Sequence, residues 1–360
     1  MISFLYLFAA LDPNAALSVL ENETAADGPG IAAVVIGDDE VVLAAARGLA
    51  DIESGEPLTV DTPMYAGSIS KVFTAMIVLK LVDDGRLTLD EQPDFGQSID
   101  RRVPFDVQLL LSHASGLPRE GDFGYWFSAR FPDETALREY VTQQAPQVRP
   151  GGKARYSNIG YAVLGLTAEQ STGRPFSALL TDLVVGPLGL ETTGGPGPVA
   201  GIARGYTPEN RLIPSVERPF AGVGAKVGDR HLREYHDAAA MTPAFGIFTS
   251  ARDLGRVARF LLSPRGGDTL SVAMRTRMRE PAPSGRGLGL GFDTIEGNTV
   301  ATHSGWFAAH RSYLLLDTAN SVGVAVIANS DDAKPARVAG ALYRMALMRD
   351  HVPVEPTVAR

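Results

Sequence analysis

The sequence predicts an α/β protein in which both ends of the chain build one antiparallel sheet and a mainly helical domain is inserted between them. Strand-like apolar runs occur near the N-terminus and again toward the C-terminus. Between them, helical periods alternate with Pro- and Gly-rich connections. We therefore expect a discontinuous sheet domain of residues 1–82 and 245–360, a helical domain of residues 83–244, and an active site at their interface.

The first strands form a predicted hairpin. Ile31–Ile36 and Val41–Ala46 flank a turn-forming cluster at residues 37–40. Both runs are apolar nearly throughout, which is typical of strands that are covered on both faces. A helix is then predicted from Val72 onward, and because it is apolar nearly all round, we expect it to be deeply buried. Gly85 suits the left-handed position that ends such a helix.

Residues 86–190 are predicted to be mainly helical. The expected helices are Val107–Leu111, Thr135–Val141, Tyr161–Glu169 and Pro175–Leu183. Residues 120–131, between two of them, are dense in aromatic side chains, which indicates either a small satellite core or the apolar wall of a substrate pocket. Residues 191–245 show long irregular stretches, and loops of such length are usually functional or mobile.

The last third of the chain returns to a sheet after a helix at Ala251–Leu262. The expected strands are Gly287–Phe292, Thr299–His303, Ser312–Asp317 and Val322–Ala328, the last two forming a hairpin. A helix at Pro335–Met348 follows them.

Composition excludes several classes of protein. The 360 residues are 45% hydrophobic and 21% charged, which is normal for a globular protein of one large or two ordinary domains. A net charge of −8 gives no footprint for nucleic acid, so we expect no such partner. There is no cysteine, which excludes disulfides, thiol catalysis and cysteine metal sites.

Residues 1–11 are the one ambiguous targeting signal. They are apolar and end in small residues, but they lack the positive charge of a secretory signal and are too short to span a bilayer. Export and a docked N-terminal helix both stay open, and a cytoplasmic location is the one we favour. We expect no membrane span elsewhere.

Ser68 and Lys71 are the first candidate catalytic pair. They are three residues apart at the start of the buried helix, so their side chains share one face. A serine hydroxyl needs a nearby base, and a lysine amine can serve if burial and neighbouring charge lower its pKa. The helix start also favours developing negative charge. Both residues are common, however, and roughly one such spacing is expected by chance in a chain of this length.

Two further short motifs are weak evidence alone, but their order along the chain after the Ser68–Lys71 pair is informative. Tyr156-Ser-Asn158 precedes a predicted helix, and His303-Ser-Gly305 ends a predicted strand, where Gly305 would let a substrate backbone approach closely. With the Ser-x-x-Lys pair ahead of them, they resemble the three-motif signature of the serine hydrolases grouped with class C β-lactamases, penicillin-binding proteins such as the serine D-Ala-D-Ala carboxypeptidases, and related esterases.

The resemblance extends from about residue 30 to residue 348. The segments that carry it are Leu110–Pro118, Pro150–Gly165, Pro187–Leu190, Phe245–Leu254 and Val326–Asn329. It implies a β-lactamase/transpeptidase-like fold, with an antiparallel sheet flanked by helices and an inserted helical domain.

The resemblance also implies a two-step acyl transfer. Ser68 would attack a carbonyl and form an acyl-enzyme that water hydrolyses. Lys71 and Tyr156 would share the role of base, and a single assignment within such a coupled pair is unsafe. Asn158 would hydrogen-bond Lys71 and the substrate, while His303 would stabilise the Tyr156 oxygen or pass on a proton.

By the same resemblance, the backbone N–H groups of Ser68 and Trp306 would form the oxyanion hole. No metal and no cofactor are implied. The expected substrate-binding residues are Gly305, Trp306, Phe307, Tyr125, Trp126 and Arg311.

The third motif departs from the class C β-lactamases, which carry lysine where this chain has His303. Histidine suits a substrate carboxylate less well, although Arg311 could still bind an anion. We therefore expect a carboxylesterase or amidase acting on small acyl substrates. The alternatives, in order, are a D-amino-acid peptidase of the D-Ala-D-Ala carboxypeptidase kind, a β-lactamase, and a non-catalytic ligand sensor. The oligomeric state stays open.

Competing chemistries lack their motifs. There is no G-x-S-x-G, no G-x-x-x-x-G-K-[ST] and no H-E-x-x-H. His231 and His236 are five apart with Glu234 between them, a spacing that does not share one helix face, so a metal site there is disfavoured.

Overall fold

The computed structural model describes residues 11–94, 103–196, 200–209, 223–233, 237–265 and 269–349. Its centre is a six-stranded antiparallel sheet in the order β10-β11-β12-β13-β1-β2. The strands are β1 (Ile31–Gly37), β2 (Glu40–Arg47), β10 (Gly291–Ile295), β11 (Asn298–Phe307), β12 (His310–Asp317) and β13 (Val322–Ala328). Since β1 pairs with β13, the two ends of the chain share this sheet, as the sequence predicts.

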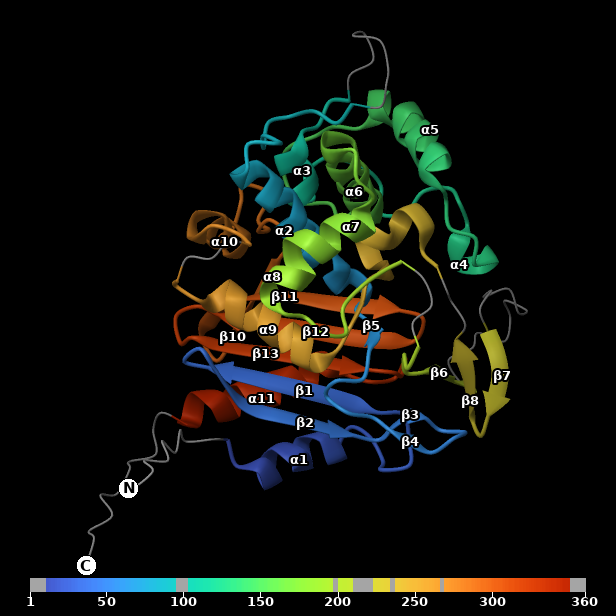
Figure 1. The fold of residues 1–360 in the computed structure, drawn as a ribbon, viewed down its shortest axis with the longest axis vertical. Helices are drawn as coiled ribbons and strands as arrows, with labels where there is room; N and C mark the ends of the chain where they lie inside the picture. The colour runs from blue at the N-terminus through green and yellow to red at the C-terminus, as the bar shows by residue number, and fades with distance from the viewer. Residues whose placement is uncertain are drawn as a thin grey trace, which may run out of the picture.

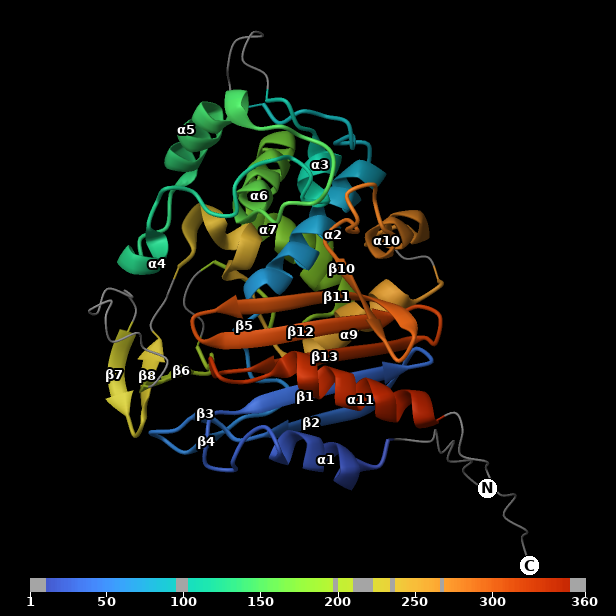
Figure 2. The ribbon, with the colours of Figure 1, turned by 180° about the vertical axis from the view of Figure 1, so that it is seen from behind.

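Helices cover both faces of the sheet (Figures 1 and 2). Helix α9 (Ala251–Leu262) packs on one face, whereas α1 (Pro13–Glu21) and α11 (Pro335–Arg349) pack on the other. Alternate residues of β1 therefore enter two different cores: Val34 belongs to the core beneath α9, and Val35 to the core beneath α11. This explains why β1 is apolar at every position, as expected for a strand covered on both sides.

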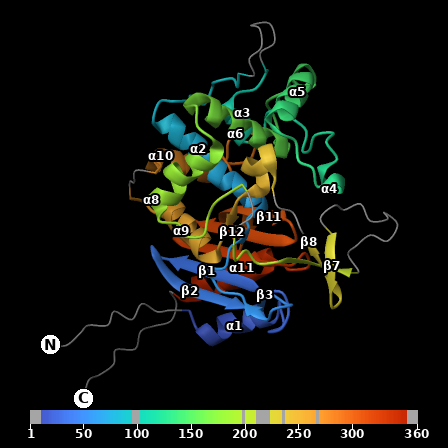
Figure 3. The same cartoon turned by 45° about the vertical axis from the view of Figure 1, so that its right-hand side comes forward.

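A second, mainly helical layer lies on the α9 side of the sheet (Figure 3). Its helices are α2 (Ser70–Asp83), α3 (Val107–Leu111), α4 (Tyr125–Ser128), α5 (Glu134–Gln144), α6 (Asn158–Thr172), α7 (Phe176–Leu180), α8 (Gly186–Leu188) and α10 (Val272–Arg279). Helix α2 is buried nearly all round, because it packs against α6 and against the turn Thr242–Gly246. The turn Gly67–Ile69 that precedes α2 contacts β11 and β12, and it thus joins the helical layer to the sheet.

Short strands complete the fold. They are β3 (Leu49–Asp51), β4 (Glu56–Pro57), β5 (Met64–Tyr65), β6 (Gly205–Pro208), β7 (Val223–Val227), β8 (Arg230–Arg233) and β9 (Phe248–Thr249). Strands β6, β8 and β7 form a small sheet inside the stretch that was expected to be irregular. Tyr206 of β6 bridges to Ser330, just after β13, so this small sheet adjoins the main one.

Two strand predictions near the third motif are corrected. The strand expected at 287–292 begins only at Gly291, because Gly289 has a left-handed φ of +94° and lies close against α2, where a Cβ would come within 2.7 Å of Ala75. His303 does not end its strand either. Strand β11 continues to Phe307, and the hairpin turns at Ala308 and Ala309, which have φ of 50° and 60°.

Residues 1–10 lie outside the described residues, and the first described helix is α1, whose N-cap Asp12 accepts a hydrogen bond from the backbone of Asn14. No described helix combines the length and the apolar character that crossing a bilayer would require.

Candidate active site

A cavity of about 1020 Å³ lies between the start of α2, the start of α6 and the edge of β11. In the part of the chain that the structure describes, β10 pairs with β11 only up to Thr302. From His303 onward, β11 is therefore an edge strand and borders the cavity. All three sequence motifs contribute residues to its wall, namely Ser68, Tyr156, Asn158, His303 and Gly305.

Ser68 borders this cavity, and Lys71 faces Ser68 from the buried side. Ser68 sits on a single 3-10 turn, Gly67–Ile69, that leads into α2. Lys71 lies in the first turn of α2 and its Nζ is 3.3 Å from Ser68 Oγ, as the spacing of the pair predicts. Lys71 is completely buried, and this burial holds its pKa well below the usual value, although the charge of Glu120 raises it in part.

The other neighbours of Lys71 decide where its amine hydrogens point. Nζ donates to Asn158 Oδ1 and to the backbone carbonyl of Ala244, both at 2.7 Å. A neutral amine has two hydrogens and one lone pair, and these two acceptors occupy both hydrogens. Ser68 Oγ, at 3.3 Å, takes the remaining position around Nζ, which is a hydrogen in the ammonium form and the lone pair in the neutral form. This arrangement suits an amine that accepts the serine proton.

Asn158 is oriented by a carboxylate. Its Nδ2 donates to Glu120 Oε1 at 2.7 Å, which turns Oδ1 toward Lys71. Tyr125 OH also donates to Glu120. Burial raises the pKa of Glu120, and its hydrogen bond with Asn158 and the charges of Arg119 and Lys71 oppose that rise. The result is a continuous chain from carboxylate to amide to amine.

Tyr156 is placed by the N-cap of α6. Ser157 Oγ accepts a hydrogen bond from Gly160 N at 2.8 Å, so α6 begins at Asn158 and Tyr156 lies just before it. Burial raises the pKa of Tyr156 to about 12, while a hydrogen bond with Ser68 and the charges of two arginines oppose the rise. Those cations, with Lys71, lie over its ring: the ring centroid is 4.9 Å from Lys71 Nζ, 5.2 Å from Arg119 Cζ and 5.6 Å from Arg286 Cζ. The phenol is protonated at neutral pH.

His303 borders the cavity as a neutral ring. Its Nδ1 lies 2.9 Å from the carbonyl oxygen of Ser304, and because a carbonyl only accepts, Nδ1 carries the hydrogen. Burial and the charge of Lys71 lower the pKa of His303 to about 3. Its Nε2 is buried and has no hydrogen-bond partner among the described residues. The ring centroids of His303 and Tyr156 are 6.3 Å apart, and because Nε2 has no partner among the described residues, it makes no hydrogen bond to the Tyr156 oxygen there.

The expected substrate-binding residues divide into two groups. Gly305, Trp306, Trp126 and Arg311 border the cavity. Tyr125 and Phe307 do not: their exposed fractions are 1% and 0%, and they pack behind Trp126. The expectation for these two is therefore wrong: Tyr125 lies on helix α4 with its ring against Trp126 and Phe131, and Phe307 is fully buried in the core. Trp306 donates its indole N–H to Asp331 Oδ1 and packs against Trp126, with ring centroids 5.3 Å apart.

Several residues of this site were missed by sequence reasoning. Glu120, Arg286 and the Ala244 carbonyl all contact or surround the Ser–Lys–Tyr cluster. Glu120 lies two residues after the Leu110–Pro118 segment, and this closeness to a segment that carries the family resemblance was a signal that sequence reasoning could have used. Arg286 lies immediately before the glycine-rich stretch that was interpreted as a strand, and a backbone carbonyl such as that of Ala244 leaves no signal in a sequence.

No group of three or more metal-ligating side chains occurs in the described ranges. Of the disfavoured histidine pair, His231 lies on β8, whereas His236 and Glu234 lie outside the described residues.

A sheet shared by both chain ends, an inserted helical layer and a Ser–Lys pair whose serine borders a cavity are features of serine hydrolases with the β-lactamase/transpeptidase fold. The model of the family described as Beta-lactamase matches residues 19–347. The chain therefore belongs to the β-lactamase family and is a serine hydrolase.

Similar proteins differ in their named activities. Esterase EstB of Burkholderia gladioli is 30% identical over 295 residues, which cover 73% of this chain and 74% of the esterase. Penicillin-binding protein 4 of Amycolatopsis lactamdurans is 28% identical over 86% of this chain and 82% of its own length. Among solved structures, the D-amino acid amidase of Ochrobactrum anthropi SV3 in complex with D-phenylalanine superposes with a TM-score of 0.74 at 24% identity, covering 92% and 98% of the two chains. The structural likeness shows a shared fold.

Proposed function

We propose that this serine hydrolase cleaves esters and amides of small acyl groups through an acyl-enzyme on Ser68. The observation that carries the proposal is the environment of Lys71. Its amine is fully buried, its pKa is lowered, and its Nζ contacts Ser68 Oγ as well as two neutral acceptors, Asn158 Oδ1 and the Ala244 carbonyl. The similarity to an esterase over most of both chains supports ester substrates.

In the acylation step, Ser68 Oγ bonds to the carbonyl carbon of the substrate while its proton passes to Lys71 Nζ. The carbonyl oxygen becomes an oxyanion that the backbone N–H groups of Ser68 and Trp306 bind. The bond to the leaving group then breaks, and the leaving oxygen or nitrogen takes a proton. Water repeats the sequence on the acyl-enzyme, releasing the acid and restoring Ser68.

Tyr156 is the candidate carrier of the proton to the leaving group. Its raised pKa, about 12, keeps it a phenol at neutral pH, so it is a donor in the resting site. Its hydrogen bond with Ser68 and its position over Lys71 link it to both partners of the transfer. Lys71 is thus the better candidate for the first base, and Tyr156 for the relay.

The state of His303 favours esters and amides over substrates that present a carboxylate at the third motif. A neutral imidazole whose free atom is an acceptor, Nε2, supplies no positive charge and no N–H at that point of the wall. A carboxylate placed against Nε2 would face an acceptor. This weakens the D-Ala-D-Ala carboxypeptidase and β-lactamase alternatives.

A second candidate, hydrolysis of D-amino-acid amides or peptides with a free amino group, is favoured by Glu120. Its carboxylate borders the cavity next to Asn158, where it could pair with a substrate ammonium. A solved D-amino acid amidase shares the fold.

The experiment compares wild type with Ser68→Ala on p-nitrophenyl acetate, D-phenylalaninamide, a blocked D-Ala-D-Ala peptide and a chromogenic cephalosporin. The proposal expects turnover of the ester that Ser68→Ala loses. Faster turnover of the amide than of the ester would move the assignment to the second candidate. A single acylation without turnover on every substrate would identify a sensor, and hydrolysis by Ser68→Ala at the wild-type rate would refute the mechanism.

A further inference from the structure

The turn that carries Ser68 lies in direct backbone contact with β11. Gly67 has a left-handed φ of +54°, and a Cβ at this position would lie 2.3 Å from the backbone nitrogen of Trp306. On the facing strand, a Cβ at Gly305 would lie 2.0 Å from the carbonyl oxygen of Ala66. Two glycines thus remove the side chains that would otherwise separate residues 66–68 from residues 305–306. The space beside Gly305, expected to admit a substrate backbone, is occupied by the chain itself.

Hydrogen bonds from two other elements fix the same turn. The carbonyl of Ala66 accepts a hydrogen bond from Ser312 Oγ at 2.7 Å, and Ser312 is buried on β12 directly opposite Gly305. The N–H of Ala66 donates to the carbonyl of Ile247 at 2.8 Å. The residue ahead of the Gly67–Ile69 turn is therefore held on both sides, by β12 and by the segment that leads into β9 (Phe248–Thr249).

We infer that Gly67, Gly305 and Ser312 are positioning residues that set the spacing between the backbone N–H groups of Ser68 and Trp306. The inference rests on the proposed function, in which these two groups bind the oxyanion. The N–H groups come from segments far apart in the sequence, and the close approach at the two glycines allows the Trp306 nitrogen to lie next to the Ser68 turn.

The size of the effect follows from contact distances. A carbon atom normally approaches another heavy atom to about 3.5 Å, so a methyl group at Gly67 would push the turn and β11 apart by about 1 Å. Displacements of about 1 Å in a reacting site cost on the order of 10²-fold in rate, and loss of one oxyanion donor costs about 10²–10³-fold. The substrate in its ground state does not require this spacing, so its binding is spared.

The test pairs Gly67→Ala with Gly85→Ala. Gly85 lies just past the other end of α2 with a similar φ of +68°, and nothing lies within 4 Å of the place where its Cβ would be. The two variants share the conformational cost of alanine at a left-handed position, but only Gly67→Ala meets Trp306. With p-nitrophenyl acetate, we expect Gly67→Ala to lower kcat by about 10²-fold with KM nearly unchanged, and Gly85→Ala to stay within about twofold of wild type.

A second measurement separates the oxyanion hole from general damage. Phenylboronic acid forms a bond from Ser68 Oγ to boron, and the resulting tetrahedral anion resembles the transition state. Its affinity should fall in Gly67→Ala in parallel with kcat. If Gly67→Ala keeps kcat within about threefold of wild type, or loses kcat while phenylboronic acid binds as before, the inference is wrong.

Ser312→Ala provides a milder variant if Gly67→Ala does not fold. It removes one hydrogen bond to the Ala66 carbonyl and adds no atoms, so we expect a fall in kcat of about 3- to 10-fold with unchanged KM and weaker boronate binding. An unchanged kcat would overturn the inference. Ser68→Ala in the same assay separates a failure of the positioning role from a failure of the proposed function. If Ser68→Ala is inactive while Gly67→Ala and Ser312→Ala match Gly85→Ala, the proposed function stands and only the positioning role fails.

Discussion

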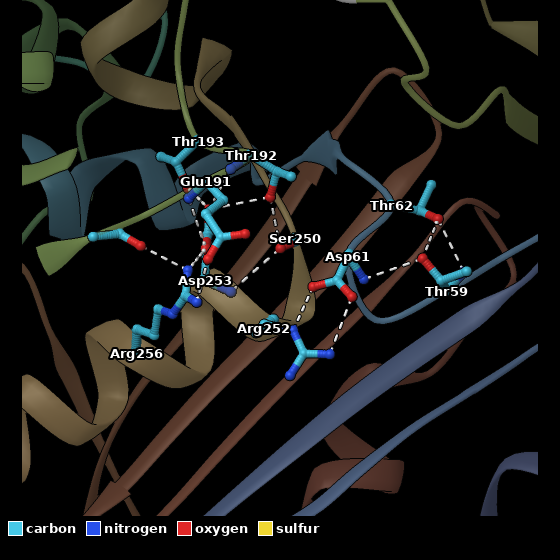
Figure 4. A network of polar contacts seen from close by, with 11 residues as sticks. Thr59, Asp61, Thr62, Glu191, Thr192, Thr193, Ser250, Arg252, Asp253 and Arg256 are labelled. Carbon is cyan, nitrogen blue, oxygen red and sulfur yellow. Dashed lines mark hydrogen bonds and ion pairs between the residues drawn. The ribbon is translucent and has the colours of Figure 1, made fainter. Parts of the chain in front are cut away.

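Two buried polar clusters of this protein differ in how completely their hydrogen bonds are satisfied. The first surrounds Asp253 at the start of α9 (Figure 4). Its carboxylate, 1% exposed, accepts hydrogen bonds from the backbone of Glu191 and Thr192, from the hydroxyls of Thr192 and Thr193, and from Arg256, at 2.8–3.1 Å. Asp253 also lies in the first turn of its helix, where the dipole favours negative charge.

The second cluster, around Lys71, is built differently. Its amine is buried beside Ser68 with a lowered pKa, and Tyr156 beside it has a raised one. His303 Nε2 is buried without a partner among the described residues. Lys71 and Tyr156 thus have shifted pKa values, and His303 retains an unused acceptor.

The comparison teaches that burial of polar groups serves two ends in one molecule. The Asp253 carboxylate accepts five hydrogen bonds, so the cluster joins residues 191–193 to α9 and contributes stability. Around Lys71 the mismatches are the chemically useful feature, because a shifted pKa and a free acceptor are available to a substrate. Substitutions should therefore affect activity in one cluster and stability in the other.

The largest expected effect is on the catalytic side. Lys71→Met keeps the length and apolar stem of the side chain but removes the amine that faces Ser68. We expect kcat/KM for an aryl ester to fall by at least about 10⁴-fold, because the serine loses its base. Circular dichroism and a thermal melt serve as the folding control. A loss smaller than about tenfold would assign the base to another residue.

Tyr156→Phe should come next, with a fall in kcat of about 10²–10⁴-fold. Its effect on the pH profile is the sharper measurement. Wild-type activity should rise as Lys71 loses its proton, at a pH well below that of an ordinary lysine, and should not decline before the Tyr156 pKa of about 12 is approached. A wild-type alkaline decline below pH 9 that disappears in Tyr156→Phe would show that tyrosinate forms much earlier and restore Tyr156 as a base.

In the Asp253 cluster, the effect should be on stability instead. Asp253→Ala leaves Arg256 and several buried donors without their acceptor, so we expect the free energy of unfolding to fall by about 3–5 kcal/mol. The rate per folded molecule, measured by active-site titration, should stay the same. Asp61→Ala is the matched control: Asp61 pairs with Arg252 at the surface of the same region, and its loss should cost under about 1 kcal/mol. Equal losses of unfolding free energy in Asp253→Ala and Asp61→Ala would show that the buried cluster contributes no more stability than a surface ion pair.

The smallest expected effect concerns acid stability. His310 is buried and donates from Nε2 to the Ala203 carbonyl at 3.0 Å, and burial lowers its pKa to about 4. The unfolded chain binds this proton near pH 6.5, so the stability is present above that pH and is lost as the pH falls toward 4. Between pH 7.5 and pH 5, His310 should account for about 2 kcal/mol of lost unfolding free energy. Urea unfolding at both pH values should show that His310→Gln loses less unfolding free energy between pH 7.5 and pH 5 than wild type does, by this amount. An identical loss in the two proteins would exclude His310 as a source of the acid sensitivity.

Local patterns predicted much of the architecture. The β1–β2 hairpin, α3, α9 and β13 lie where the apolar periodicity places them, within a residue or so. The approach of Ser68 and Lys71 follows from helix geometry, since residues three apart share a face. Predictions failed where contacts between distant segments overrule the local pattern, as at Gly289, which lies against α2, and at Phe307, which turns inward behind Trp126.

The sequence by itself determined the class of chemistry, because a serine and a lysine on one helical turn and two ordered motifs are properties of the chain alone. Only the tertiary structure decided the protonation states and the spacing of the site. A pKa depends on burial and on charges that come from other segments, as Glu120 and Arg286 act on Lys71. The distance between the Ser68 turn and Trp306 likewise depends on two glycines, at positions 67 and 305, that meet only when the chain is folded.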